Sequence, residues 1–134
     1  VQEVIDNLKI TDDERVALNN NIEVFEKYIN SSLFDMLKKS KAVYKETPFY
    51  MEIPYKDTKE NVLVQGVIDL YFVNQDGEII LVDYKTDRNV DENELKERYE
   101  YQLQLYKEAI EKSCKQKVYK MIIYSTFLNK EIEL

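Results

Sequence analysis

The chain has 134 residues, of which 44% are hydrophobic and 34% are charged, and its formal net charge is −7. This length suits one domain, and the composition is typical of a soluble globular protein rather than a disordered one. With no histidine and a single cysteine, Cys114, the chain excludes histidine catalysis, histidine zinc sites and an intrachain disulfide. The negative charge argues against a protein that grips nucleic acid by a basic surface alone, although a bound divalent cation reverses the charge locally.

No apolar run approaches the roughly 20 residues of a membrane-spanning helix, and no signal peptide opens the chain. Together with the single cysteine, these features predict a cytoplasmic protein that makes no membrane contact. Residues 1–10 have helical spacing but no preceding cap. We therefore expect residues 1–134 to be one domain from the C-terminal part of a larger protein.

Thr11 and Glu14 form a capping-box pattern, which predicts a helix that runs to about Asn30. Its apolar positions include Val16, Ile22, Phe25 and Ile29. The pair at residues 31–32 then offers a new N-cap for a short helix that ends in the basic run at residues 38–41. We interpret this run as a solvated helix end favoured by the helix dipole, with a phosphate contact as the alternative.

Strand patterns follow. Residues 42–55 predict one or two strands, which Pro48 restricts to an edge, a bulge or a kink. Residues 62–73 and 78–85 predict two more strands joined by a tight turn at residues 75–77, where Asp-Gly is a typical hairpin pair.

Asp91 predicts the N-cap of a long helix over residues 92–115. Side chains recur on it at three- and four-residue spacing and mark an inward stripe: Tyr99, Gln102, Leu103, Tyr106 and Ile110. A strand at residues 118–127 should lie parallel to an earlier one, because a helix between two strands usually makes a right-handed crossover. With a short edge strand after a turn at residues 129–130, the predicted class is α/β (α+β), a mixed sheet with helices packed on it.

Three charged side chains interrupt the apolar strands of the predicted hairpin: Asp69 in the first, and Asp83 and Lys85 in the second. A buried carboxylate is costly unless it is paired or binds a cation. Asp83 and Lys85 share one face of their strand, and the hairpin can bring Asp69 beside Asp83. Either Lys85 or an ion such as Mg²⁺ or Mn²⁺ can neutralise the pair, and the backbone carbonyl of Tyr84 could add a ligand.

This arrangement suits hydrolysis of a phosphodiester bond. A metal held by the two aspartates would polarise the phosphate and activate a water molecule, while Lys85 would orient that water or neutralise charge in the transition state. A structural salt bridge between Lys85 and one of the aspartates is the alternative interpretation.

These residues resemble the PD-(D/E)XK nuclease superfamily in its RecB-like branch. The matching motifs are GVID at 66–69, VDYKT at 82–86 and QxxxY at 102–106. A glutamate before a Pro-Phe pair, ETPF at 46–49, is similar to the C-terminal nuclease domain of the AddA-type chain of AddAB-type helicase–nucleases. The resemblance covers roughly residues 20–134 and implies a restriction-endonuclease-like core with the order helices–βββ–α–β.

The resemblance also implies roles for individual residues. Asp69 and Asp83 look like the metal ligands, Lys85 like the catalytic lysine and Glu46 like an additional acidic residue of the site. The helix pair Gln102 and Tyr106 looks like the pair that lines the site and approaches the DNA backbone. Without the family, these two would be an ordinary helix-to-sheet interface.

The implied function is a Mg²⁺- or Mn²⁺-dependent deoxyribonuclease within an ATP-dependent helicase–nuclease for double-strand break repair and recombination. Beside a second nuclease subunit, it would cut single strands of DNA delivered by the helicase portion of the same polypeptide. The alternative from another class is a non-catalytic DNA-guiding or subunit-docking domain of the same fold. A stand-alone defence or restriction-type nuclease is a third reading.

Two departures from the family pattern bear on this function. The family usually has a metal-binding histidine upstream of Glu46, and this chain has none, so we expect weak metal binding and low activity from the isolated chain. One cysteine cannot build the iron–sulfur cluster that some relatives carry.

Overall fold

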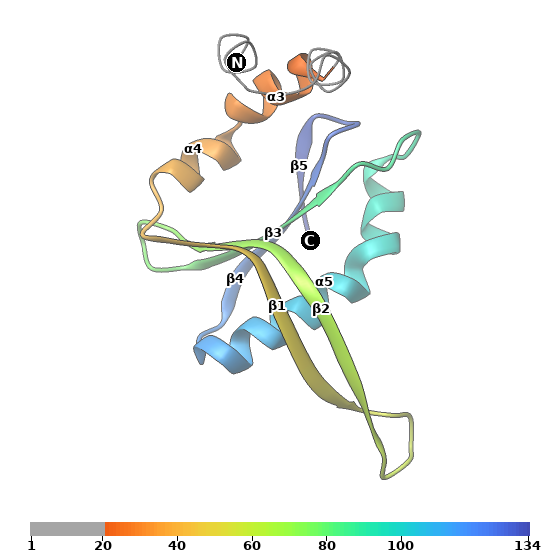
Figure 1. The fold of residues 1–134 in the computed structure, drawn as a ribbon. Helices are drawn as coiled ribbons and strands as arrows, with labels where there is room; N and C mark the ends of the chain where they lie inside the picture. Colours follow the sequence, from red (N-terminus) through yellow and green to blue (C-terminus); the bar gives the residue numbers. More distant parts are fainter. Residues whose placement is uncertain (1–20) are drawn as a thin grey trace, which may run out of the picture.

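A computed structural model describes residues 21–134 (Figure 1). The predicted helix start at Thr11 and Glu14, and its apolar position Val16, lie outside these residues. The described elements follow one another as α3 (Ile22–Ile29), α4 (Ser32–Lys38), β1 (Ala42–Pro54), β2 (Asn61–Val73), β3 (Ile79–Lys85), α5 (Glu92–Cys114), β4 (Val118–Ser125) and β5 (Lys130–Glu133). None of the helices in this range combines the length and apolar character that a membrane crossing requires.

The five strands form one mixed sheet in the order β1-β2-β3-β4-β5. Every neighbouring pair is antiparallel except β3 and β4, which are parallel, as the crossover through α5 predicts. Pro48 lies in the edge strand β1, where its missing N–H leaves no gap inside the sheet. The β2–β3 turn is tight: Asn74 Oδ1 accepts hydrogen bonds from the amides of Asp76 and Glu78, and Gly77 has φ +81°.

Helices cover both faces of the sheet. On one face α5 begins at Asp91, whose side chain accepts a hydrogen bond from the Glu94 amide at 2.9 Å as the predicted N-cap. Its buried side chains are Leu95, Leu103, Tyr106 and Ile110. The stripe predicted on this helix is therefore the face that packs, with Tyr99 and Gln102 half-buried beside it.

On the opposite face, Leu33 of α4 packs into a second cluster with side chains of β2, β3 and β4. The side chain of Ser31 caps α4 by accepting a hydrogen bond from the Phe34 amide. The basic run that follows fits a solvated helix end, because Lys38 and Lys39 are exposed and Lys39 pairs with Asp35 within the helix.

The apolar residues of α3 do not enter the core. Phe25 and Ile29 are 40% and 38% exposed, and no residue of α3 is buried. Instead Tyr28 packs its ring against Phe34 and Tyr124. This aromatic contact decides which side of the short helix faces the sheet.

β2 leaves β3 near its middle, and this divergence determines the shape of the protein. Their ladder runs only from the pair Val73–Ile79 to the pair Leu70–Val82, whereas β1 and β2 stay paired as far as Pro54 and Asn61. The β1–β2 ribbon consequently extends away from the sheet (Figure 1). A gap opens between β2 and β3 just beyond Leu70 and Val82, at the positions of Asp69 and Asp83.

Gly66 on this ribbon is needed for packing against α5. A Cβ atom there would lie 3.1 Å from Cε1 and 3.3 Å from Cζ of Phe49, whose ring packs edge-on against Tyr106 at 5.4 Å between centroids. Gly66→Ala should therefore destabilise the fold by about 1 kcal/mol, as overpacking does, measured by urea unfolding. The double variant with Phe49→Leu should lose less free energy of unfolding than the two single variants lose together. Strictly additive losses would contradict the proposed clash.

Candidate active site

Asp69 lies at the point where the two strands separate. Its Oδ2 atom accepts a hydrogen bond from the Tyr84 amide at 3.0 Å. The carboxylate therefore takes the place of the backbone acceptor that Tyr84 lacks on the side of β2. Because the N–H and C=O of one strand residue point to the same side, the Tyr84 carbonyl also faces the gap. The predicted carboxylate and the predicted carbonyl ligand thus converge on one place.

Asp83 is the buried acid of the site, with 2% of its surface exposed. Burial raises the pKa of Asp83 to about 6; the ammonium of Lys85 opposes this increase, and the carboxylate of Asp69 adds to it. Asp83 Oδ2 lies 2.8 Å from Lys85 Nζ, yet within residues 21–134 this oxygen accepts no well-directed hydrogen bond. It is a charged, under-bonded atom beside a second carboxylate.

Lys85 is held on three sides. Besides the ion pair with Asp83, its Nζ atom donates a hydrogen bond to Gln102 Oε1 at 2.9 Å and lies 3.9 Å from the centre of the Tyr99 ring. A cation over an aromatic face is attracted by the ring quadrupole. These contacts restrict the ammonium to one position next to the two carboxylates.

Gln102 and Tyr106 lie one turn apart on α5, and both reach the site. Gln102 contacts Lys85 directly. Burial, followed by the charges of Asp83 and Asp69, raises the pKa of the Tyr106 hydroxyl, so this group stays neutral. The helix-to-sheet interface and the site are thus built from the same face of α5.

Glu46 is less closely joined to the others. The register of β1 sets it opposite Asp69, between the pairs Lys45–Leu70 and Thr47–Ile68. Its side chain is exposed, and it lines a cavity of about 650 Å³ together with Asp69 and Tyr84. Its φ of +46° is a left-handed conformation that is strained for a residue other than glycine.

Sequence reasoning missed two residues at the site, Tyr99 and Asp87. The Tyr99 hydroxyl donates to both carboxylate oxygens of Asp87, at 2.9 and 2.7 Å, and this contact orients the ring beneath Lys85. The hydrogen bonds from Tyr99 and then from Arg98 lower the pKa of Asp87, so it remains a charged acceptor. The signal was available, because Tyr99 precedes Gln102 by three residues on the same helix face.

The donor set fits a hard divalent cation with few protein ligands. Residues 21–134 contain no group of three or more His, Cys, Asp or Glu side chains arranged to hold a metal ion. However, Mg²⁺ is often held by only one or two carboxylates, with water and substrate phosphate completing its shell. Asp69, the under-bonded Asp83 and the Tyr84 carbonyl provide such an all-oxygen set.

Comparison with known proteins assigns the family. The sequence model of the PD-(D/E)XK nuclease superfamily matches residues 2–131. The chain belongs to this superfamily. The mixed sheet with helices on it is consistent with the fold of these nucleases, so the fold predicted from the sequence is confirmed.

Individual relatives of this superfamily member are long proteins, each named as the A-type chain of an ATP-dependent helicase/nuclease. The one from Clostridium kluyveri is 39% identical over 138 residues, which cover 92% of this chain and 11% of that protein. The one from Clostridium botulinum is 39% identical over 120 residues, which cover 83% of this chain and 10% of that protein. The one from Ligilactobacillus salivarius is 36% identical over 141 residues, which cover 98% of this chain and 11% of that protein. The chain therefore spans about a tenth of these relatives.

Proposed function

We propose that this chain is the nuclease domain of an ATP-dependent helicase–nuclease and hydrolyses phosphodiester bonds of DNA with Mg²⁺ or Mn²⁺. The observation that carries the proposal is the meeting of Asp69, Asp83 and Lys85 where β2 separates from β3. The names of the relatives support the helicase context.

The catalytic roles follow from the contacts of each side chain. Asp69, Asp83 and the Tyr84 carbonyl would hold the divalent ion, which would supply polarisation of the scissile phosphate and a lower pKa for a water molecule. Lys85, positioned by Gln102 and Tyr99, donates to the attacking water or to a phosphate oxygen and offsets the negative charge that develops there.

Two further residues contact the substrate in this proposal. The neutral Tyr106 hydroxyl is a donor for a phosphate oxygen. Glu46 lines the cavity beside Asp69 and Tyr84, where it would add a further acidic group to the site.

The proposed partners are single-stranded DNA, a second nuclease subunit and the helicase portion of the same polypeptide, in the cytoplasm. The competing function is a DNA-guiding or docking domain that keeps the fold without catalysis. The direct Lys85–Asp83 ion pair favours this second candidate, because such a pair needs no metal to be stable.

Cleavage of labelled single-stranded DNA separates these two functions. The wild-type chain should cut in Mg²⁺ or Mn²⁺ and stop when the ion is chelated. Asp69→Asn should lose most of the activity yet keep its fold, because asparagine Oδ1 can still accept the Tyr84 amide. Asp57→Asn, in the exposed β1–β2 turn, is the matched control and should cut like wild type. Equal cleavage by all three proteins would refute the catalytic assignment.

A further inference from the structure

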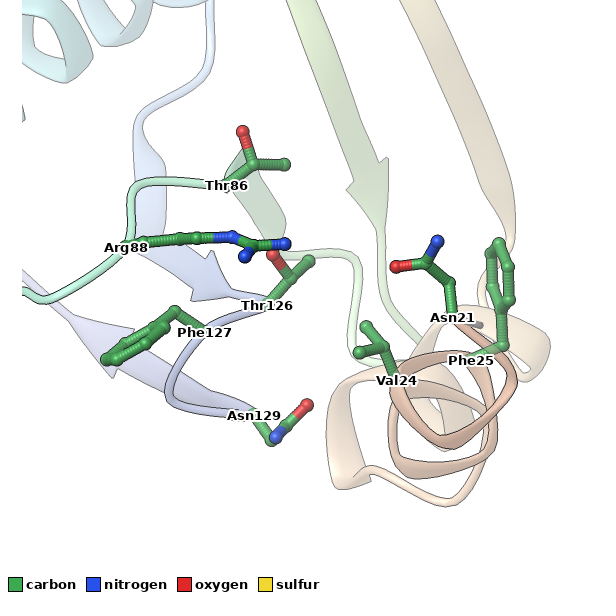
Figure 2. Close-up of a pocket in the computed structure, with 8 residues that line it drawn as sticks. All are labelled: Asn21, Val24, Phe25, Thr86, Arg88, Thr126, Phe127 and Asn129. Atoms are coloured by element: carbon green, nitrogen blue, oxygen red, sulfur yellow. The ribbon is translucent and has the colours of Figure 1, made fainter. Parts of the chain in front are cut away.

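A second cavity, of about 520 Å³, adjoins the candidate site between α3 and the ends of β3 and β4 (Figure 2). Its walls come from α3, the segment after β3 and the β4–β5 turn: Asn21, Val24, Phe25, Thr86, Arg88, Thr126, Phe127 and Asn129. The Thr126 amide donates a hydrogen bond to the Lys85 carbonyl at 3.0 Å. The cavity therefore begins one residue beyond the lysine of the candidate site.

Arg88 gives this cavity a positive charge that no acidic side chain in the wall balances. Its side chain is exposed and, in the part of the chain that the structure describes, takes part in no ion pair or hydrogen bond. Arg98, by contrast, lies 2.6 Å from Asp87. In a chain with 26 acidic and 19 basic residues, an arginine that faces an acid-free wall is a feature suited to binding an anion.

The same cavity presents aromatic rings and polar groups. Phe25 and Phe127 remain 40% and 43% exposed. A cationic groove beside exposed aromatic rings is typical of sites for single-stranded nucleic acid, in which bases stack on the rings. The hydroxyl of Thr86 is a donor for a phosphate oxygen.

We propose that this cavity binds the nucleotide next to the cleaved phosphate, with Arg88 on the phosphate of that nucleotide and Phe127 stacked on its base. The inference rests on the proposed nuclease function and adds the residues that hold the neighbouring nucleotide of the DNA strand. The volume is adequate for a nucleotide. Recognition is tolerant of sequence, because every base offers a face for stacking.

Binding of a fluorescein-labelled oligothymidylate, followed by anisotropy in EDTA, tests the role of Arg88 without cleavage. Arg88→Gln should weaken binding about tenfold and make the slope of log affinity against log salt concentration shallower by about 0.7, as expected for one lost phosphate contact on a single strand. Lys117→Gln removes the same charge from a side chain that is 92% exposed at the start of β4. This control should bind like wild type.

Phe127 is tested with a base-dependent readout. Phe127→Ala should bind the oligothymidylate about tenfold more weakly, as the loss of one base stack predicts, whereas Phe127→Tyr should retain binding. On an abasic oligonucleotide of the same length, Phe127→Ala should bind with the same affinity as wild type, while Arg88→Gln should still bind more weakly than wild type. An equal loss of affinity for both oligonucleotides in Phe127→Ala would contradict stacking of a base on this ring.

A small diester separates this inference from the proposed function. Bis(4-nitrophenyl) phosphate has no neighbouring nucleotide, so Arg88→Gln should hydrolyse it at the wild-type rate while its kcat/KM on the oligonucleotide falls about tenfold. A wild-type chain that cleaves neither substrate even at a saturating concentration of Mn²⁺ defeats the nuclease proposal, and the anisotropy result then still decides whether the cavity binds a nucleotide. Wild-type oligonucleotide affinity in Arg88→Gln overturns the inference even if the chain is an active nuclease.

Discussion

Asp83→Asn should lower metal-dependent DNA cleavage by about 10³-fold, because in the proposed mechanism it removes a charged metal ligand from a site that has two carboxylates close together. The same change should stabilise the metal-free chain at pH 8. Asparagine keeps the shape and an acceptor oxygen for Lys85, but it does not bury a negative charge beside Asp69. Loss of activity combined with a gain in stability distinguishes a functional acid from a structural one.

The effect on stability depends on pH in a defined direction. Because the pKa of Asp83 is raised from 3.8 to about 6 in the folded chain, the folded state binds this proton more tightly than the unfolded state. The contribution of Asp83 to the free energy of unfolding is therefore fully present below about pH 4 and is lost as the pH rises through 6. Wild type should lose on the order of 3 kcal/mol from this group across that window, and Asp83→Asn should not.

Urea unfolding between pH 4 and pH 8, without metal, measures this difference. Asp57→Asn, a change in the exposed β1–β2 turn, is the control and should follow the wild-type curve. Parallel curves for wild type and Asp83→Asn would contradict the raised pKa. Undiminished cleavage by Asp83→Asn would contradict its role as a ligand.

Much of the fold follows from local sequence patterns. The N-caps at Ser31 and Asp91, the turn at Gly77 and the edge position of Pro48 each depend on neighbouring residues, and each prediction is confirmed. The parallel direction of β4 relative to an earlier strand follows from the crossover rule, which needs only the order of elements, whereas its pairing with β3 was not predicted. These features require no knowledge of distant contacts.

The rest depends on contacts between distant residues. The gap that brings Asp69 to the Tyr84 amide exists because β2 stays with β1 and leaves β3, and no local pattern marks where that happens. The left-handed backbone of Glu46 is unexpected for a residue other than glycine. The orientation of α3 depends on the aromatic contacts of Tyr28 with Phe34 and Tyr124, which no local pattern indicates.

Lys85→Met should also reduce cleavage by about 10³-fold, as loss of one donor to transition-state charge does, but its effect on stability should be opposite to that of Asp83→Asn. Removing the ammonium leaves Asp83 buried and unpaired, and the pKa of Asp83 should rise further because Lys85 lowers it. Breaking a buried ion pair from one side costs about 3–5 kcal/mol. The metal-free variant should therefore unfold at lower urea than wild type at pH 8.

The double variant Asp83→Asn with Lys85→Met tests this reasoning most directly. It removes both charges, so its stability at pH 8 should recover to near the wild-type value, which a double-mutant cycle reports as a large coupling energy. Lys112→Met, on the exposed side of α5, is the control for loss of a lysine and should change neither cleavage nor stability. Cleavage should stay absent in the double variant, because the proposed catalysis needs both charges, whereas folding needs only that the two charges balance. A double variant as unstable as Lys85→Met would show that the contacts of Lys85 with Gln102 and Tyr99, rather than its pairing with Asp83, hold the site together.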